Sequence, residues 1–163
     1  MALTTNKNYL QPTGFKIVID RRNYSNLEFF AQSVIHPGAS VNPLEIPTTR
    51  VTSLPLAGDK ITYTNLTMDV ILDEDMESYK EMQNWLERIV NEGHVPETTD
   101  TKVSTYADIN VMIMSSHNNK NVQIKYKECM PVDIGSVNLA SNVGDVAYLT
   151  FQVSFRFSEF EIS

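Results

Sequence analysis

The residues best suited to bind a metal ion are three histidines, which stand far apart in the chain. They are His36, His94 and His117. None lies within four residues of another histidine or beside a Cys-X-X-Cys pair, which are the spacings that build protein zinc sites. The sequence therefore predicts isolated histidines in loops or at polar positions, and no metal site.

The other residue types that could carry chemistry also lack the required spacing. Cys129 lies beside Met130 and Pro131 at the end of an expected strand, which favours a small packing residue over an activated thiolate. No serine stands in a G-X-S-X-G motif, and the six isolated glycines form neither a dinucleotide-binding motif nor a P-loop. The acidic run at residues 73–75 lacks the spacing of a calcium-binding EF-hand and is expected to begin a helix. We therefore expect no catalytic residue and no cofactor.

The composition indicates a single globular domain over residues 1–163. Thirteen Lys and Arg against 20 Asp and Glu give a net charge of -7, and 42% of the residues are hydrophobic. With one cysteine the chain forms no intrachain disulfide, which is typical of a protein made in a reducing cytoplasm. The sequence predicts neither a secretion signal nor direct insertion into a membrane. A net negative charge argues against a protein that grips phosphate backbones, but it is compatible with one that lets nucleic acid pass.

Alternation of apolar and polar residues predicts that most of the chain forms β-strands. In the most regular strand Phe151, Val153 and Phe155 share one face, with polar residues on the other. The strands over residues 109–113 and 122–126 should pair as a hairpin. The expected strands cover residues 14–20, 29–36, 109–113, 122–126 and 148–157.

Residues 39–57 differ from the strands around them because they contain Pro43, Pro47 and Pro55. Proline cannot donate a ladder hydrogen bond, so a central strand is excluded there. We expect an irregular edge or an extended loop that reaches outward from the body.

The segment that follows is expected to be one long bent strand over residues 59–72. Its apolar positions change parity near Thr64 and Asn65, which indicates a β-bulge. Residues 75–92 then show the one clear helical periodicity, with acidic residues at the start and Gly93 placed to end the helix. The fold class is therefore α+β and mostly β: two packed antiparallel sheets, as a sandwich or barrel, with one flanking α-helix.

The order of these segments resembles the tail tube proteins of contractile-tailed, T4-like bacteriophages. The resemblance covers about residues 12–161, and the order and spacing of its motifs are more specific than any one of them. The residues that carry it are Phe15, Ile17, Ile19, Phe29, Phe30, Pro37, Gly38, Ala57, Gly58, Asp59, Lys60, Trp85, Pro131, Gly135, Val137, Leu139, Ser141, Asn142, the strand 148–157, Glu159, Phe160 and Glu161.

This resemblance implies an assembly. Six copies would form a ring whose inner sheets join into one β-barrel, and rings would stack into a hollow tube inside a contractile sheath. An N-terminal arm, residues 1–13, and the loop 39–57 would contact neighbouring subunits. The implied partners are other copies of the chain, the sheath protein, the baseplate tube initiator, the tail terminator and viral DNA in transit. The implied location is the virion tail, after synthesis in the host cytoplasm.

A genome channel needs a neutral or acidic wall, since a basic one would bind DNA through counterion release. We expect the wall to come from polar strand positions, for which an ordinary solvated sheet face is the alternative. Arg156 departs from this pattern, and an ion pair with an acid across a subunit interface would explain it. The channel-lining candidates are Thr62, Thr64, Thr67, Asp69, Thr150, Gln152 and Ser154.

Three alternatives remain at this point. A ring protein of a type VI or other contractile injection system shares the fold but carries protein cargo. A baseplate tube initiator also shares it, although such proteins typically need additional docking segments. An enzyme with an unrecognised site would be a monomer with a convergent polar pocket.

Overall fold

The computed structural model describes residues 10, 12–20, 23–49, 51–92, 104–115, 117, 119–140 and 148–163. The expected helix end at Gly93 and nearly all of the N-terminal arm lie outside these residues. The elements in chain order are β1 (Phe15–Val18), α1 (Ser25–Phe30), β2 (Ala31–Ile35), β3 (Ala39–Val41), β4 (Leu44–Ile46), β5 (Leu54–Leu56), β6 (Ile61–Tyr63), β7 (Leu66–Ile71), α2 (Glu77–Glu92), β8 (Ala107–Met114), β9 (Lys120–Ile134), β10 (Thr150–Arg156) and β11 (Glu159–Ile162).

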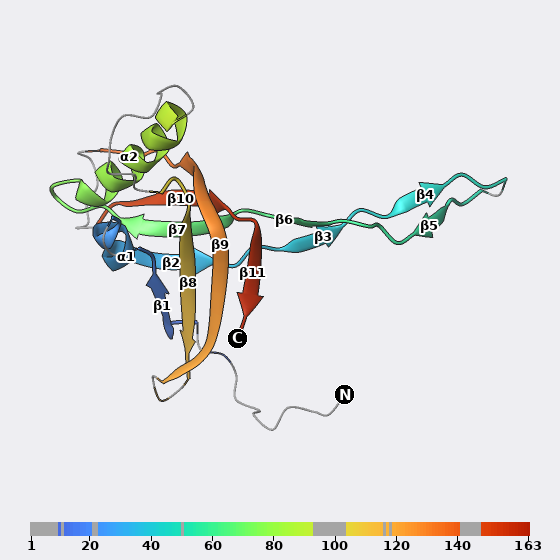
Figure 1. The fold of residues 1–163 in the computed structure, drawn as a ribbon, viewed down its shortest axis with the longest axis horizontal. Coiled ribbons are helices and arrows are strands. Elements are labelled where there is room, and N and C mark those ends of the chain that lie inside the picture. The colour runs from blue at the N-terminus through green and yellow to red at the C-terminus, as the bar shows by residue number, and fades with distance from the viewer. Residues whose placement is uncertain are drawn as a thin grey trace.

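Strand β9 joins the two sheets of the body (Figure 1). Its first part pairs with β8 and β11, and its last part pairs with β10. Glu128 lies between the two parts with φ of 52°, in the left-handed region that strands do not use. The chain bends there, so one sheet holds β1, β8, β9 and β11 (the β8 sheet) and the other holds β9, β10, β7 and β2 (the β7 sheet). All pairs within both sheets are antiparallel, as the sequence predicts.

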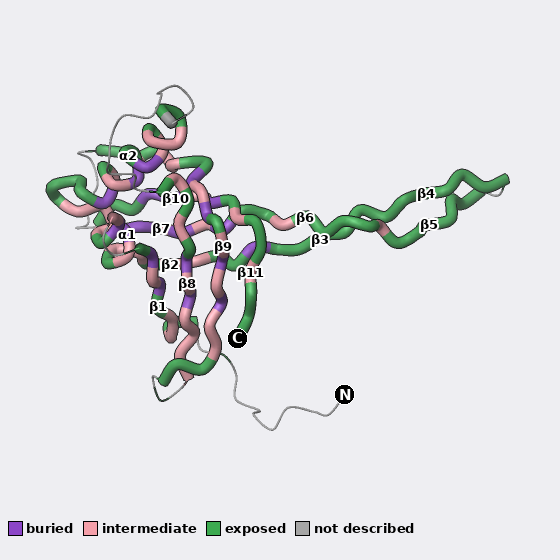
Figure 2. The backbone as a smooth tube through the Cα atoms, in the orientation of Figure 1, coloured by how far each residue is buried: buried purple, intermediate pink, exposed green. Residues whose placement is uncertain are grey.

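The core lies between these two sheets. Burial alternates along β7 and β10, where every second side chain is buried and the others reach solvent (Figure 2). The predicted apolar face of the last strand is therefore confirmed. Facing it from the β8 sheet are Ile109, Val111, Ile124 and Tyr126, all under 9% exposed.

Helix α2 closes one end of the core and lies within the range 75–92 expected to be helical, beginning at Glu77. Trp85 is fully buried, stacks on Tyr24 at 4.0 Å between ring centroids and donates its indole N–H to the Thr105 carbonyl at 2.7 Å. No helix in the described part of the chain is long and apolar enough to span a membrane.

Asp73 caps the start of α2. Its carboxylate accepts hydrogen bonds from the Glu77 and Ser78 amides at 3.0 and 3.1 Å and from the Ser78 hydroxyl at 2.8 Å. Desolvation raises the pKa of Asp73, but these hydrogen bonds outweigh it and the net shift is downward. The expected acidic helix start is thus present, with one of its acids acting as a cap.

The strand predicted over 29–36 is partly wrong. Phe29 and Phe30 belong to the short helix α1, and the strand begins at Ala31. The cause is a distant carboxylate: Glu81 of α2 accepts hydrogen bonds from the amides of Asn26 and Leu27, at 3.3 and 3.0 Å. These bonds satisfy free N–H groups at the start of α1, and a helix of six residues is too short to show periodicity. The described residues therefore contain two helices, where the sequence predicted one.

The long strand predicted over 59–72 is also divided. It breaks at Thr64 and Asn65, where the parity changes, into β6 and β7. Gly38 and Thr64 pair at the break, since the Thr64 amide donates to the Gly38 carbonyl at 3.0 Å and the Gly38 amide donates to Thr64 Oγ1 at 2.8 Å. The change of parity at Thr64 and Asn65 therefore marks the point where the chain leaves the body, and not a bulge within one strand.

Residues 39–49 and 51–63 form a two-stranded ribbon, the hairpin arm, that projects from the body (Figure 1). In it β3 pairs with β6 and β4 pairs with β5. The prolines that exclude a central strand are accommodated because the ribbon has only edges. The segment 39–57 is thus extended, and what it contacts stays a prediction.

Replacing Asp73 with Ala should lower the free energy of unfolding by about 1 kcal/mol, because the first turn of α2 loses its cap. Urea denaturation followed by Trp85 fluorescence measures the change. Glu74→Ala is the matched control, because Glu74 is exposed and makes no hydrogen bond within the described part of the chain, and it should change stability by less than about 0.5 kcal/mol. Equal losses in the two variants would contradict the capping role.

Candidate functional site

The outer face of the β7 sheet brings together five of the seven predicted channel-lining residues. Thr67 and Asp69 lie on β7, and Thr150, Gln152 and Ser154 lie on β10. Gln152 stands directly opposite Asp69, and Ser154 opposite Thr67, so they occupy neighbouring positions on one face. The buried residues of both strands point the other way, into the core.

The other two candidates lie elsewhere. Thr62 is on β6, opposite Ser40 in the hairpin arm. Thr64 lies at the root of the arm, where its hydroxyl accepts a hydrogen bond from the Gly38 amide. Sequence parity alone could not separate them from the other five, because the break between β6 and β7 is a tertiary feature.

Asp69 is the centre of a hydrogen-bonded row across this face. Ser33 of β2 donates its hydroxyl to Asp69 Oδ2 at 2.6 Å, and Gln152 Nε2 lies 3.5 Å from Oδ1. The row continues to Gly135, whose amide donates to the Gln152 carbonyl at 2.7 Å. A side chain at position 135 would meet Gln152 backbone atoms at 3.2 Å, so the close approach of the chains there favours glycine.

The face carries little charge. Asp69 and Asp133 are its acids and Arg156 is its base, so two negative charges and one positive leave -1. Asp133 is opposite Ser154, and Arg156 is opposite Met130 on the same side of the sheet. Within the described residues Arg156 makes no ion pair in this single chain.

The groups that could carry chemistry are dispersed. His36 Nδ1 lies 2.6 Å from the Tyr126 hydroxyl and packs edge-on to Phe160, at the root of the arm. His117 lies in the connection between β8 and β9, and His94 is outside the described residues. Cys129 is buried, and desolvation raises the pKa of its thiol to about 12. Within the part of the chain that the structure describes, no three His, Cys, Asp or Glu residues are arranged to hold a metal ion.

The β7 sheet ends in two strand edges that pair with no other strand in the described part of the chain. One edge is β2, and the other is the last part of β9, beyond its pairing with β8. Unpaired edges expose rows of N–H and C=O groups and favour pairing with another chain.

The hairpin arm exposes apolar side chains along its whole length. A two-stranded ribbon is at best marginally stable in water by itself, and this one has no core beneath it. The side chains have exposed fractions from 39% to complete exposure, and they are Val41, Leu44, Ile46, Val51, Leu54, Leu56 and Ile61.

Two open sheet edges, a nearly neutral polar face and an apolar arm define a class of protein: a structural subunit built to assemble with other chains. The family model for phage tail tube proteins matches residues 2–163. The chain therefore belongs to the phage tail tube protein family, as its resemblance indicates.

Solved structures share the fold over nearly the whole chain. A chain of the tube-terminating cap of the anti-feeding prophage superposes with a TM-score of 0.67 at 10% identity, covering 99% of this chain and 95% of that one. A chain of the sheath–tube complex of an extracellular contractile injection system, in the extended state, gives 0.65 at 10% identity, covering 99% of both. A chain of the anti-feeding prophage baseplate gives 0.65 at 13% identity, with 99% and 97% covered. A search of curated protein sequences found no match.

Replacing Gly58 with Ala should disorder the pairing of β3 with β6 and leave the body intact. The added Cβ would lie 2.1 Å from the Asn42 carbonyl oxygen, so the backbone has to move. Cross-strand NMR contacts between Val41 and Ile61 should disappear, while the melting temperature stays within about 2 °C because no described residue of the arm belongs to the core cluster.

Gly38→Ala is the matched control for this variant. Its Cβ would meet Thr64 Oγ1 at 3.9 Å, an ordinary contact, so the Val41 and Ile61 contacts should survive. If Gly58→Ala kept the contacts, or unfolded the body, the separation of arm from body would be wrong.

Proposed function

We propose that this protein is the structural subunit of a contractile tail tube, in which hexameric rings stack around a central channel for genome passage. The observation that carries the proposal is the pair of open edges on the β7 sheet, in a chain that belongs to the tail tube family. The ring number of six comes from the family resemblance.

The strand directions support closure of such a ring. The β7 sheet has four strands, and each runs antiparallel to its neighbour from β2 through β7 and β10 to β9. An even number of alternating strands places β2 of one copy antiparallel to β9 of the next, at every junction alike. Closing the sheet on itself removes the exposed edges, and a head-to-tail interface that closes gives a ring.

The electrostatics support the outer face of the β7 sheet as the channel wall. The side chains on this face carry hydroxyl groups, an amide and few charges. The wall that we propose consists of Thr67, Asp69, Thr150, Gln152 and Ser154. A face with a formal charge of -1 offers no attraction for DNA phosphates to slow transit. Arg156 would be neutralised by an acid of the adjacent copy.

The proposal extends to the partners of a tube. Those are the sheath protein, the baseplate tube initiator, the tail terminator and viral DNA in transit, with the virion tail as the location after synthesis in the host cytoplasm. The structural neighbours come from sheath–tube, cap and baseplate assemblies, which supports the first three. The hairpin arm and the N-terminal residues 1–13 would make the contacts between subunits.

A contractile injection system is the second candidate function. The observation that favours it is the similarity to chains of the anti-feeding prophage and of an extracellular injection system. Such a tube would carry protein instead of a genome. Neighbouring genes for a capsid and a terminase, or for effectors without a capsid, would distinguish the two.

Negative-stain electron microscopy of the purified protein tests the tube itself. Hollow rods or six-fold rings with a central channel are expected. Monomers that still fail to assemble when the matching initiator is added would contradict the proposal.

Replacing both Thr150 and Gln152 with Lys should slow DNA ejection from the assembled particle by about tenfold or more, because each ring adds basic groups that bind phosphates. Ejection is measured by fluorescence of a DNA dye after triggering, on particles that have normal tails by microscopy. Gln83→Lys with Asn84→Lys adds the same charge on the exposed face of α2 and should leave the rate unchanged. Normal ejection from the first variant would remove these residues from the channel wall.

A further inference from the structure

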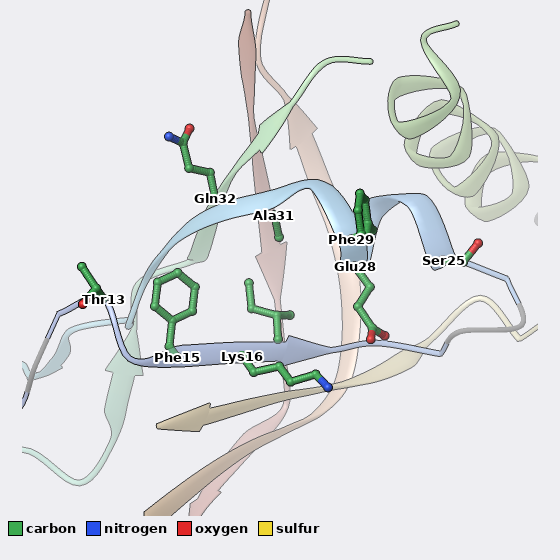
Figure 3. Close-up of a pocket in the computed structure, with 9 residues that line it drawn as sticks. Thr13, Phe15, Lys16, Ser25, Glu28, Phe29, Ala31 and Gln32 are labelled. Carbon is green, nitrogen blue, oxygen red and sulfur yellow. The ribbon is translucent and has the colours of Figure 1, made fainter. Parts of the chain in front are cut away.

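An open cleft lies between the free edges of the two sheets. Its walls are β1, which ends the β8 sheet, and β2, which ends the β7 sheet, with α1 at one end (Figure 3). The cleft has a volume of about 610 Å³ and is lined by Phe15, Phe29 and Ala31 among others.

Phe29 is the most unusual residue of this cleft. Its side chain is 80% exposed, although phenylalanine is among the residues most often buried. It meets Phe30 edge-on at 5.0 Å between ring centroids, while Phe30 packs against the core. Phe15 of β1 lines the other end of the cleft, where it is half-buried and packs against the core (Figure 3). The cleft therefore presents two aromatic rings to a partner.

A matching apolar group stands at the opposite edge of the β7 sheet. Residues 136–140 follow β9 and belong to no strand, and Leu139 is 77% exposed there. Val137 packs against the core and so holds this segment to the body. The segment thus offers a single free apolar side chain on an anchored backbone.

The strand pairing places these two features at the same end of the sheet. Gly135, Gln152, Asp69 and Ser33 form one row across the four strands. Because β9 runs antiparallel to β2, the residues after Gly135 and those before Ser33 extend beyond the row in the same direction. A copy whose β9 edge lies beside β2 therefore brings its residues 136–140 to α1 and the cleft.

We infer that the cleft between β1 and β2 receives residues 136–140 of the adjacent copy in the ring, with Leu139 packed against Phe29. This inference rests on the proposed function, because it requires the junction between β2 and β9. The inference adds a second contact to that junction. The first is the pairing of β2 with β9 through backbone hydrogen bonds, and the second is formed by side chains. The inference also explains why Phe29 is exposed in a single copy.

Mixed assembly of two single variants tests the contact. Phe29→Cys protein and Leu139→Cys protein are combined with wild-type protein, assembled, and treated with a short bismaleimide. A cross-linked dimer that requires both variants is expected, and it forms only between copies. In a protein carrying both cysteines, the products should form a ladder that ends at six copies. The native Cys129 is buried, which keeps it out of the reaction.

The control pairs Phe29→Cys with Leu54→Cys of the hairpin arm, and it should give no dimer. Normal rings or tubes with no Phe29 to Leu139 dimer would overturn the inference while leaving the proposed function intact. A dimer with Leu54 in place of Leu139 would overturn it too, by assigning the cleft to the arm. Wild-type protein that forms only monomers would overturn the proposed function, and the junction with it.

Phe29→Asp gives an independent readout. It should leave the monomer's melting temperature within about 2 °C, since the side chain is exposed, and reduce ring formation at fixed protein concentration at least tenfold. The matched variant Phe29→Leu should form rings at close to the wild-type level, because it keeps the apolar contact. Normal ring formation by Phe29→Asp would overturn the inference.

Discussion

The rest of the structure depends on β9 belonging to both sheets. A strand of 15 residues is long enough to pair with β8 and β11 in its first part and with β10 in its last. The bend at Glu128 turns one continuous ladder into two layers, and the core forms between them. The same bend leaves the last part of β9 with one edge that no described strand pairs with. One backbone feature therefore creates both the hydrophobic core and an open edge.

Regular alternation made the sheets predictable, and local exceptions to it caused the errors. Along β10 the core and solvent faces follow sequence parity without a break, so its residues could be assigned to faces from the sequence. Helix α1 could not be predicted, because its first turn depends on Glu81, which lies more than 50 positions away. The split at Thr64 was visible as a change of parity. Its meaning required the tertiary structure, because a bulge and a departure from the sheet give the same pattern.

The candidate channel face was predictable for a similar reason and to a similar extent. Residues on β7 and β10 alternate, so their polar set shares a face once the strands pair. A polar sheet face can line a lumen or meet bulk solvent, and only the arrangement of neighbouring copies decides between the two. The periodicity of a single sequence does not contain that information. The cleft at Phe29 could not be predicted, because the apolar run from Phe29 favours a strand and the residue lies in α1.

No described residue of the hairpin arm belongs to the buried core cluster, and only Tyr63 at its root touches residues that pack against the core, through ring contacts with Phe157 and Phe160. The free energy of unfolding of the body therefore depends little on the side chains of the arm. Its exposed apolar residues can therefore be exchanged with little cost to folding of the body. The sequence of this region can therefore change without loss of the fold. It is also the natural place to redesign assembly specificity, since tubes of different origin could be made mutually incompatible there.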